Sequence, residues 1–149
     1  MERTLVLIKP DAMQRGIAGE ILARLERRGL RIAGLKLLQV DRALAEKHYG
    51  EHAGKPFFNG LVEYITACPI IAAVFEGTDS VAAVRKTVGS TKPNEADPGT
   101  IRGDFGLEIG RNLIHASDSL TSAEREVAFF FNAAELQSYE RGIDKWVFE

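Results

Sequence analysis

The sequence that decides the fold is TLVLIKPD, residues 4–11. Its apolar part, Leu5–Ile8, is short and rich in branched side chains, which predicts a strand in the centre of a sheet. The next three residues, Lys9-Pro10-Asp11, end this run with charge and a proline. We therefore expect a central strand at Leu5–Ile8 and a chain that leaves the sheet at Lys9.

Further elements follow from the spacing of apolar residues. Ile and Leu at 17, 21, 22 and 25 have helical spacing, and Gly29 ends that helix. Segment 103–109 alternates between apolar and other residues, as a strand with one covered face does. TSAE at 121–124 resembles a capping box and predicts a helix that runs to Phe131. The other expected elements are strands at 30–40 and 70–75, helices at 42–50, 59–66 and 80–88, and a loop at 89–102.

The order of these elements indicates the fold class. It contains the split βαβ pattern, which favours a ferredoxin-like α+β fold, βαββαβ, over a doubly wound parallel sheet. We expect a four-stranded antiparallel sheet, a helical insert between the second and third strands, and an extra C-terminal helix and tail. A length of 149 residues without repeats or low-complexity linkers favours one domain over residues 1–149.

Composition limits the classes of function and location. The formal net charge is −2, so no global positive field indicates a specific nucleic-acid partner. The single cysteine, Cys68, cannot form an intrachain disulfide, which fits a reducing compartment. The apolar run at 4–8 is far too short for a signal peptide or a membrane span. We expect a soluble, cytoplasmic protein without a membrane partner.

Two phosphate-binding motifs are absent. Gly29 and Gly34 have the GxxxxG spacing of a P-loop, but Leu35 stands where a lysine is required. The segment also lies within an expected strand, where its amides could not surround a phosphate. The chain contains no GxGxxG motif. Any nucleotide site must therefore be built from scattered side chains.

The segment NLIHASD, residues 112–118, concentrates reactive groups at the end of a strand and just before a helix. Such junctions are common sites of function because a rigid scaffold holds the side chains. Its histidine, His115, could be a nucleophile, a general base, a metal ligand or a surface residue. Position alone does not decide among these roles.

Five motifs together resemble one family. TLVLIKPD at 4–11, HY at 48–49, KPFF at 55–58, GTIRGDF at 99–105 and NxxHxSD at 112–118 have the order and spacing of nucleoside diphosphate kinases. The resemblance covers essentially the whole chain. It implies transfer of the γ-phosphate from a nucleoside triphosphate to a nucleoside diphosphate, by a ping-pong reaction through a phosphohistidine, with Mg²⁺ and with broad base specificity. It also implies the ferredoxin-like core.

The resemblance assigns the reacting groups. His115 matches the nucleophile, and Glu126 matches the carboxylate that orients it, with Ser117 as a bridge. Tyr49 matches a phenol near the histidine. A neutral imidazole suits this chemistry because it is nucleophilic near neutral pH and its phosphoramidate stays reactive. His48 and His52 lack such context and are expected to be structural or surface residues, with a place behind the site as the alternative for His48. Asp118 is expected to organise the turn.

The nucleotide contacts are implied by the same match. Cationic side chains would surround the phosphates, because phosphoryl transfer depends on positioning and fixed positive charge. A base clamp would use the flat face that every base has, rather than the base edges. The implied contacts are Lys9, Arg85, Arg102 and Thr91 on the phosphates, Asn112 and Lys9 on the sugar, and Phe57, Ile109 and Leu61 around the base. The family usually has valine where this chain has Ile109.

Metal, assembly and rival functions complete the expectations. Mg²⁺ would arrive on the nucleotide phosphates, without a protein ligand. The resemblance implies a homo-oligomer. A hexamer is favoured over a tetramer, because the loop that contains Pro93 corresponds to a subunit contact in hexameric members. The aromatic tail at 144–149 is expected to pack on a neighbouring subunit or on its own core. Three rivals remain: a nucleic-acid-binding module on the same fold, a non-catalytic interaction protein, and a phosphohistidine carrier for proteins.

Overall fold

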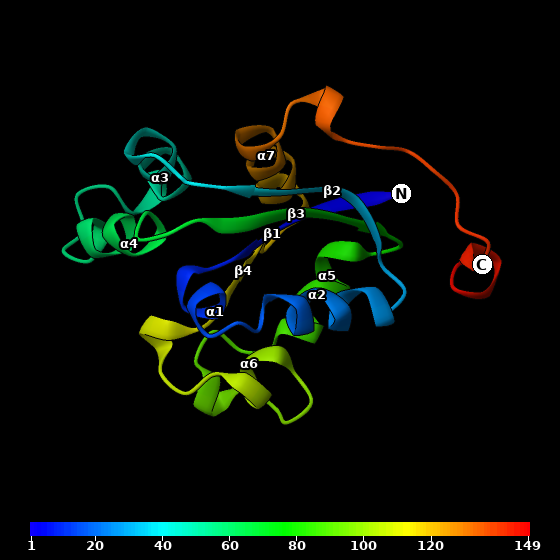
Figure 1. The fold of residues 1–149 in the computed structure, drawn as a ribbon, viewed down its shortest axis with the longest axis horizontal. Helices are drawn as coiled ribbons and strands as arrows, with labels where there is room; N and C mark the ends of the chain where they lie inside the picture. The colour runs from blue at the N-terminus through cyan, green and yellow to red at the C-terminus, as the bar shows by residue number, and fades with distance from the viewer.

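The computed structural model describes residues 1–149 and contains one four-stranded antiparallel sheet in the order β2-β3-β1-β4 (Figure 1). This order confirms the ferredoxin-like α+β fold. The strands are β1 Glu2–Ile8, β2 Arg31–Leu38, β3 Ile70–Gly77 and β4 Ile114–Ala116. The α-helices are α1 Pro10–Gln14, α2 Ala18–Arg27, α3 Arg42–His48, α4 Phe58–Ile65, α5 Ser80–Val88, α6 Ile101–Phe105 and α7 Leu120–Phe130.

Helices cover both faces of the sheet. Figure 1 shows α2 and α5 on one face and α7 on the other, with α3 and α4 at one end. The side chains of β1 alternate between the two cores: Val6 and Ile8 join the α2 and α5 side, whereas Leu5 and Leu7 join the side of α3, α4 and α7. All of these residues are fully buried. This two-sided burial explains why the central strand is a continuous apolar run rather than an alternating one.

The predicted strand at 103–109 is wrong. Residues 101–105 form α6, whose first turn is capped by Thr100: its hydroxyl accepts the Gly103 N–H at 3.0 Å. Leu107 and Ile109 are 70% and 55% exposed, so their alternation does not reflect a face packed on the sheet. The true fourth strand, β4, has three residues, which is too short to produce a recognisable period. The expected loop at 89–102 accordingly ends in a helix.

Two helix starts also differ from expectation. The chain leaves the sheet at Lys9 as expected, but Pro10 then begins α1, a helix that the sequence pattern did not predict; proline at the first helical position loses no hydrogen bond. Helix α7 begins at Leu120, and its cap is Ser119, whose hydroxyl accepts the Ser122 N–H at 3.1 Å. The predicted capping box at 121–124 is therefore wrong, because the cap lies two residues earlier than Thr121.

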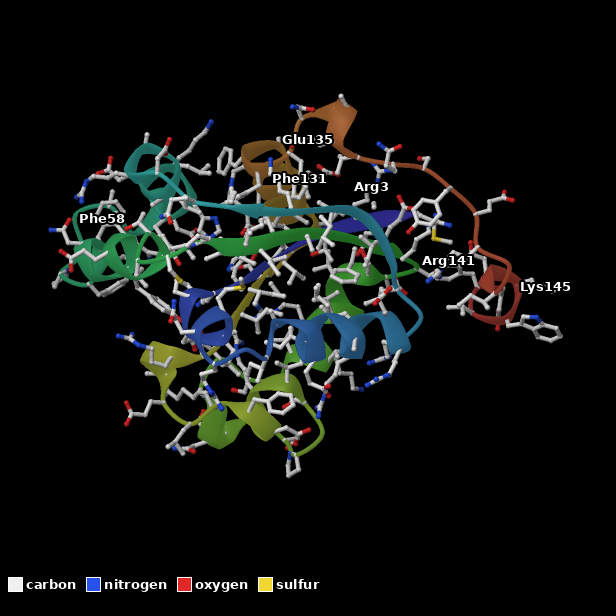
Figure 2. The ribbon with its side chains drawn as sticks, in the orientation of Figure 1. Arg3, Phe58, Phe131, Glu135, Arg141 and Lys145 are labelled. Carbon is white, nitrogen blue, oxygen red and sulfur yellow. The ribbon has the colours of Figure 1, made fainter.

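The C-terminal tail packs on its own chain at the end of the sheet where β1 begins. Arg141, labelled in Figure 2, donates to the carbonyls of Leu30 and Gly29. The ring of Phe148 lies close to Gly77, while Trp146 remains 81% exposed. None of the helices has the length and apolar composition needed to cross a lipid bilayer.

Candidate active site

A polar cavity of about 290 Å³ lies where β1 and β4 meet the helices, at the opposite end of the sheet from the tail. It brings together most of the residues predicted for phosphate and sugar binding and for the reaction itself. Those that line it are Lys9, Tyr49, Arg85, Thr91, Arg102, Asn112, His115 and Glu126. The predicted residues Ser117, Phe57, Leu61 and Ile109 do not line it. His48 and Arg125, to which the sequence assigned no role in the reaction, do.

His115 lies in the middle of β4, opposite Leu7 of β1. Its Nε2 is hydrogen-bonded to Oε1 of Glu126, a buried residue on α7. A carboxylate only accepts hydrogen bonds, so Nε2 carries the proton and Nδ1 keeps a free lone pair. The sheet and α7 thus select one nitrogen of the imidazole for reaction.

Ser117 does not form the expected bridge between these two groups. Glu126 contacts His115 directly, and the fully buried Ser117 hydroxyl has no hydrogen-bond partner. The phenol of Tyr49 is likewise unpaired, although the ring lines the cavity. Burial raises the pKa of Tyr49 to about 12, so the hydroxyl stays protonated and available as a donor.

His48, for which the sequence left open a structural place, a surface place or one behind the site, lies directly against His115. It ends α3, and its side chain is only 3% exposed. Its ring packs edge-on against His115, with centroids 4.6 Å apart, and its Nδ1 lies 3.9 Å from Glu126 Oε1. Burial, followed by the nearby charges of His115 and Lys9, lowers the pKa of His48 to about 2. The ring is therefore a neutral wall against His115; only its place beside Tyr49 in the HY motif could have signalled this.

The donor atoms of His48, His115 and Glu126 lie within 4.8 Å of one another, a possible metal-ligand group. Two nitrogens and one oxygen suit zinc better than Mg²⁺, which prefers oxygen ligands. However, Nε2 of His115 and the carboxylate of Glu126 are already bonded to each other. The cationic side chains of Lys9, Arg85, Arg102 and Arg125 in the same cavity also oppose a free cation. This group therefore does not fit Mg²⁺, and the cavity suits an anion.

Lys9 and Asn112 form a hydrogen-bonded pair in the cavity wall. The Lys9 ammonium donates to Asn112 Oδ1 at 2.9 Å, and the Asn112 amide donates to the Thr91 carbonyl at 3.1 Å. Burial, followed by the charge of Arg102, lowers the pKa of Lys9 to about 8. A phosphate group placed here would relieve the repulsion between the cations.

Arg102 was expected to have its guanidinium free for phosphate, but much of the guanidinium is already hydrogen-bonded to the backbone. It is 4% exposed and donates to the carbonyls of Asn112, Gly89 and Ile114. Burial, followed by the charge of Arg85, lowers the pKa of Arg102 to about 10. A guanidinium has five N–H donors, so those left over still face the cavity. Arg102 therefore braces the backbone around β4 and adds positive charge to the site.

The predicted base clamp lies at the surface. Phe57 and Ile109 are 51% and 55% exposed, and Ile109 belongs to a short 3-10 helix at Ile109–Arg111 rather than to a strand. The ring of Phe57 packs against that of His52, with centroids 5.3 Å apart. Leu61 packs against the core on the α3 and α4 side. Phe57 and Ile109 therefore have free faces, whereas Leu61 is largely a packing residue.

Asp118 organises the turn before α7, as expected. Hydrogen bonds from the hydroxyls of Ser122 and Ser119 lower the pKa of Asp118. The carboxylate is therefore committed to the local turn.

Comparison with known proteins agrees with this arrangement. A family model described as nucleoside diphosphate kinase matches residues 2–136. The nucleoside diphosphate kinase of Pelotomaculum thermopropionicum is 58% identical and that of Desulforamulus reducens 54% identical, each over the full length of both chains. A halophilic nucleoside diphosphate kinase from Halobacterium salinarum, solved in complex with CDP, superposes with a TM-score of 0.97 at 49% identity, over 99% of each chain. The chain belongs to the nucleoside diphosphate kinase family of enzymes.

Proposed function

We propose that this enzyme transfers the γ-phosphate of a nucleoside triphosphate to a nucleoside diphosphate in a ping-pong reaction through His115. One observation carries the proposal. Glu126 holds Nε2 of His115, which leaves Nδ1 free in a cavity lined by Lys9, Arg85 and Arg102. A fixed nucleophile within a cationic pocket is what a loose phosphoryl-transfer transition state requires.

In the first half-reaction, Nδ1 of His115 attacks the γ-phosphorus of the bound triphosphate. The N–P bond forms while the bond to the β,γ-bridging oxygen breaks, and the nucleoside diphosphate leaves with that electron pair. Positive charge grows on the imidazole, and the Glu126 carboxylate stabilises it through the Nε2–H bond. A second diphosphate then attacks the phosphohistidine by the reverse path, which restores the free imidazole.

Mg²⁺ would enter with the nucleotide, where it neutralises phosphate charge and orients the γ-phosphate. Lys9, Arg85 and Arg102 supply positive charge, and Thr91 adds a polar contact at the rim of the cavity. Tyr49 lines the same cavity and keeps its hydroxyl protonated.

The nucleoside would lie between the cavity and the exposed side chains of Phe57 and Ile109. Stacking and apolar contact with these two side chains do not distinguish base edges, which supports broad base specificity. Asn112 and Lys9 would hold the sugar of both ribo- and deoxyribonucleotides. The Halobacterium salinarum enzyme, a close structural neighbour, was solved in complex with CDP, which supports nucleotide binding by this chain.

A nucleic-acid-binding function on the same fold has less support. That function needs aromatic side chains exposed on the open face of the sheet. Here both faces of the sheet are covered by helices, and β1 is fully buried from Leu5 to Ile8. The non-catalytic alternative is disfavoured because the enzyme family is established and the reactive groups converge.

We also propose a homo-oligomer, with a hexamer favoured, that works in the cytoplasm. Leu35 and Leu37 on the edge strand β2 are 49% and 66% exposed, and Trp146 is 81% exposed. Apolar side chains of this size at a sheet edge invite contact with another chain. The single cysteine suits a reducing compartment. Mass photometry of the purified protein should give the mass of six chains; a four-chain mass would contradict the hexamer.

Labelling tests the reaction. The protein is incubated with γ-labelled ATP and Mg²⁺ without an acceptor, which should give an acid-labile, base-stable phosphoprotein that any added nucleoside diphosphate discharges. His115→Ala should abolish the label. His52→Ala, which removes the other solvent-accessible imidazole, should retain it. Label that persists in His115→Ala, or that only a protein acceptor discharges, would overturn the proposal.

A further inference from the structure

The chain enters β4 through a tight turn centred on Leu113. Leu113 has a φ of +74°, and the Ile114 N–H donates to the Asn112 carbonyl at 2.8 Å. These two features define a γ-turn of the strained form, which residues with a Cβ rarely adopt. The Leu113 side chain is nevertheless fully buried in the core. Such a conformation persists only where its surroundings hold it.

Asp11, in the first turn of α1, holds this γ-turn. Its Oδ2 accepts the Leu113 N–H at 3.0 Å, and its Oδ1 accepts the Tyr64 hydroxyl. The Lys9 N–H donates to the Leu113 carbonyl at 2.9 Å, so both backbone polar groups of Leu113 are engaged by the start of α1. Burial, followed by the bond to Asp11, raises the pKa of Tyr64, so the phenol remains a donor. The carboxylate is therefore held between the turn and α4.

The γ-turn lies between two groups of the active site. Asn112 precedes it and bonds the Lys9 ammonium, while His115 follows it by two residues. Both side chains line the cavity, whereas Asp11 and Leu113 do not. A relaxed turn would change the separation of Asn112 and His115 even if every cavity side chain were intact.

We propose that Asp11 is a positioning residue for phosphoryl transfer: by holding the Leu113 turn, it sets His115 relative to the Asn112–Lys9 pair. The proposal rests on the function proposed above. Loss of the Asp11 carboxylate should mainly slow the chemical step, because displacement of a reacting group by about 1 Å costs on the order of 10²-fold in rate. Nucleotide affinity is less sensitive, since Arg85 bonds the Ala116 carbonyl, outside the turn, and Phe57 has no hydrogen bond to the turn.

The first test compares two variants with a matched control. Asp11→Asn keeps the shape but turns one of the two acceptor oxygens into an amide donor, so the side chain can no longer accept from both Leu113 and Tyr64, and Tyr64→Phe removes only the hydroxyl. Single-turnover labelling by γ-labelled ATP and Mg²⁺ should slow by about 10- to 100-fold in Asp11→Asn, and less in Tyr64→Phe. The dissociation constant of ADP, measured by calorimetry, should change by less than about threefold.

Asp41→Asn is the control, because the Asp41 carboxylate also accepts a backbone N–H, that of Leu44, but has no contact with the Leu113 turn and does not line the cavity. It should label at the wild-type rate. A wild-type rate in Asp11→Asn would overturn the proposal, as would equal slowing in Asp41→Asn. If Asp11→Asn does not fold, a wild-type rate in Tyr64→Phe overturns it. Absence of label in the wild-type protein would instead overturn the proposed function.

Chemical rescue separates positioning from general loosening. In His115→Gly, free imidazole replaces the missing side chain and attacks the γ-phosphorus without attachment to the turn. Asp11→Asn should therefore slow the rescued reaction much less than the wild-type reaction. An equally large slowing in both backgrounds would show that Asp11 does not act through the placement of His115.

Discussion

The hydrogen bond between His115 and Glu126 decides which nitrogen of the imidazole is free to react. The tautomer depends on both residues, since in a free imidazole the proton exchanges between the two nitrogens. Glu126 is buried on α7 and so is held in one position. The charge of the carboxylate should matter most as positive charge appears on the ring.

Glu126→Gln keeps the size of the side chain but removes this charge. We expect the rate of His115 phosphorylation in quenched flow to fall by about 10²-fold or more, as it does when a preorganised electrostatic partner is lost. Glu124→Gln, on the exposed side of the same helix, is the control and should behave as wild type. A change of less than about threefold in Glu126→Gln would contradict the assigned role.

Lys9 should make activity sensitive to alkaline pH. Burial and the neighbouring Arg102 lower its pKa from 10.5 to about 8, so the free enzyme loses this positive charge as pH rises through that value. Since kcat/KM reports groups in the free enzyme, it should fall above that pH, while kcat should be flatter because bound phosphate retains the proton. Lys9→Arg stays charged and should lack the alkaline fall. If the fall persists in Lys9→Arg, another group causes it.

Among the elements, β4 and α7 carry His115 and Glu126, and both differ from what the sequence pattern indicated. A three-residue strand gives no periodic signal, whereas the alternation at 103–109 belongs to α6 and a surface loop. Helix α7 matters because it positions Glu126 on the second turn after its start. Its stability depends in part on the Ser119 cap.

Ser119→Ala removes the hydroxyl that accepts the Ser122 N–H. We expect a loss of about 1 kcal/mol in the free energy of unfolding, as is usual for a helix cap. For a chain of this size the Tm should fall by about 2–4 °C. Ser119→Thr retains the cap and should be close to wild type in a thermal melt. Equal melting of the two variants would show that the cap does not stabilise α7.

At the scale of the whole molecule, ion pairs stabilise the end of the sheet far from the active site. Glu76 on β3 accepts from Arg3 and Arg31, and Arg31 also pairs with Asp144 of the tail (Figure 2 labels Arg3). Burial alone raises the pKa of Glu76, but hydrogen bonds from Arg31 and Arg3 outweigh it and hold the pKa below 4.5. The folded chain therefore binds fewer protons here than the unfolded chain, and this stabilisation is lost at low pH.

Glu76→Gln should lower the free energy of unfolding by about 3 kcal/mol at neutral pH, because it leaves two arginines poorly paired. In urea titrations the difference in the free energy of unfolding between wild type and Glu76→Gln should shrink as pH falls below 4.5, the ordinary pKa of this carboxyl. Labelling of His115 should be unchanged below the melting temperature. Glu135→Gln, which breaks an exposed pair with Lys36, should cost less than about 1 kcal/mol. A gap that stays constant down to acid pH would contradict this account.

The sequence by itself determined the fold class and most of the active-site chemistry. The apolar run at Leu5–Ile8 and the order of elements depend on local pattern, and the motifs around Lys9, Arg102 and His115 carry the family signature. Only the tertiary structure decided that His48 packs against His115, that Glu126 contacts His115 without Ser117, and that Asp11 holds Leu113. The physical reason is that these contacts join segments distant in the sequence, and the Asp11 contact involves a residue with positive φ; neither feature leaves a periodic trace in the chain.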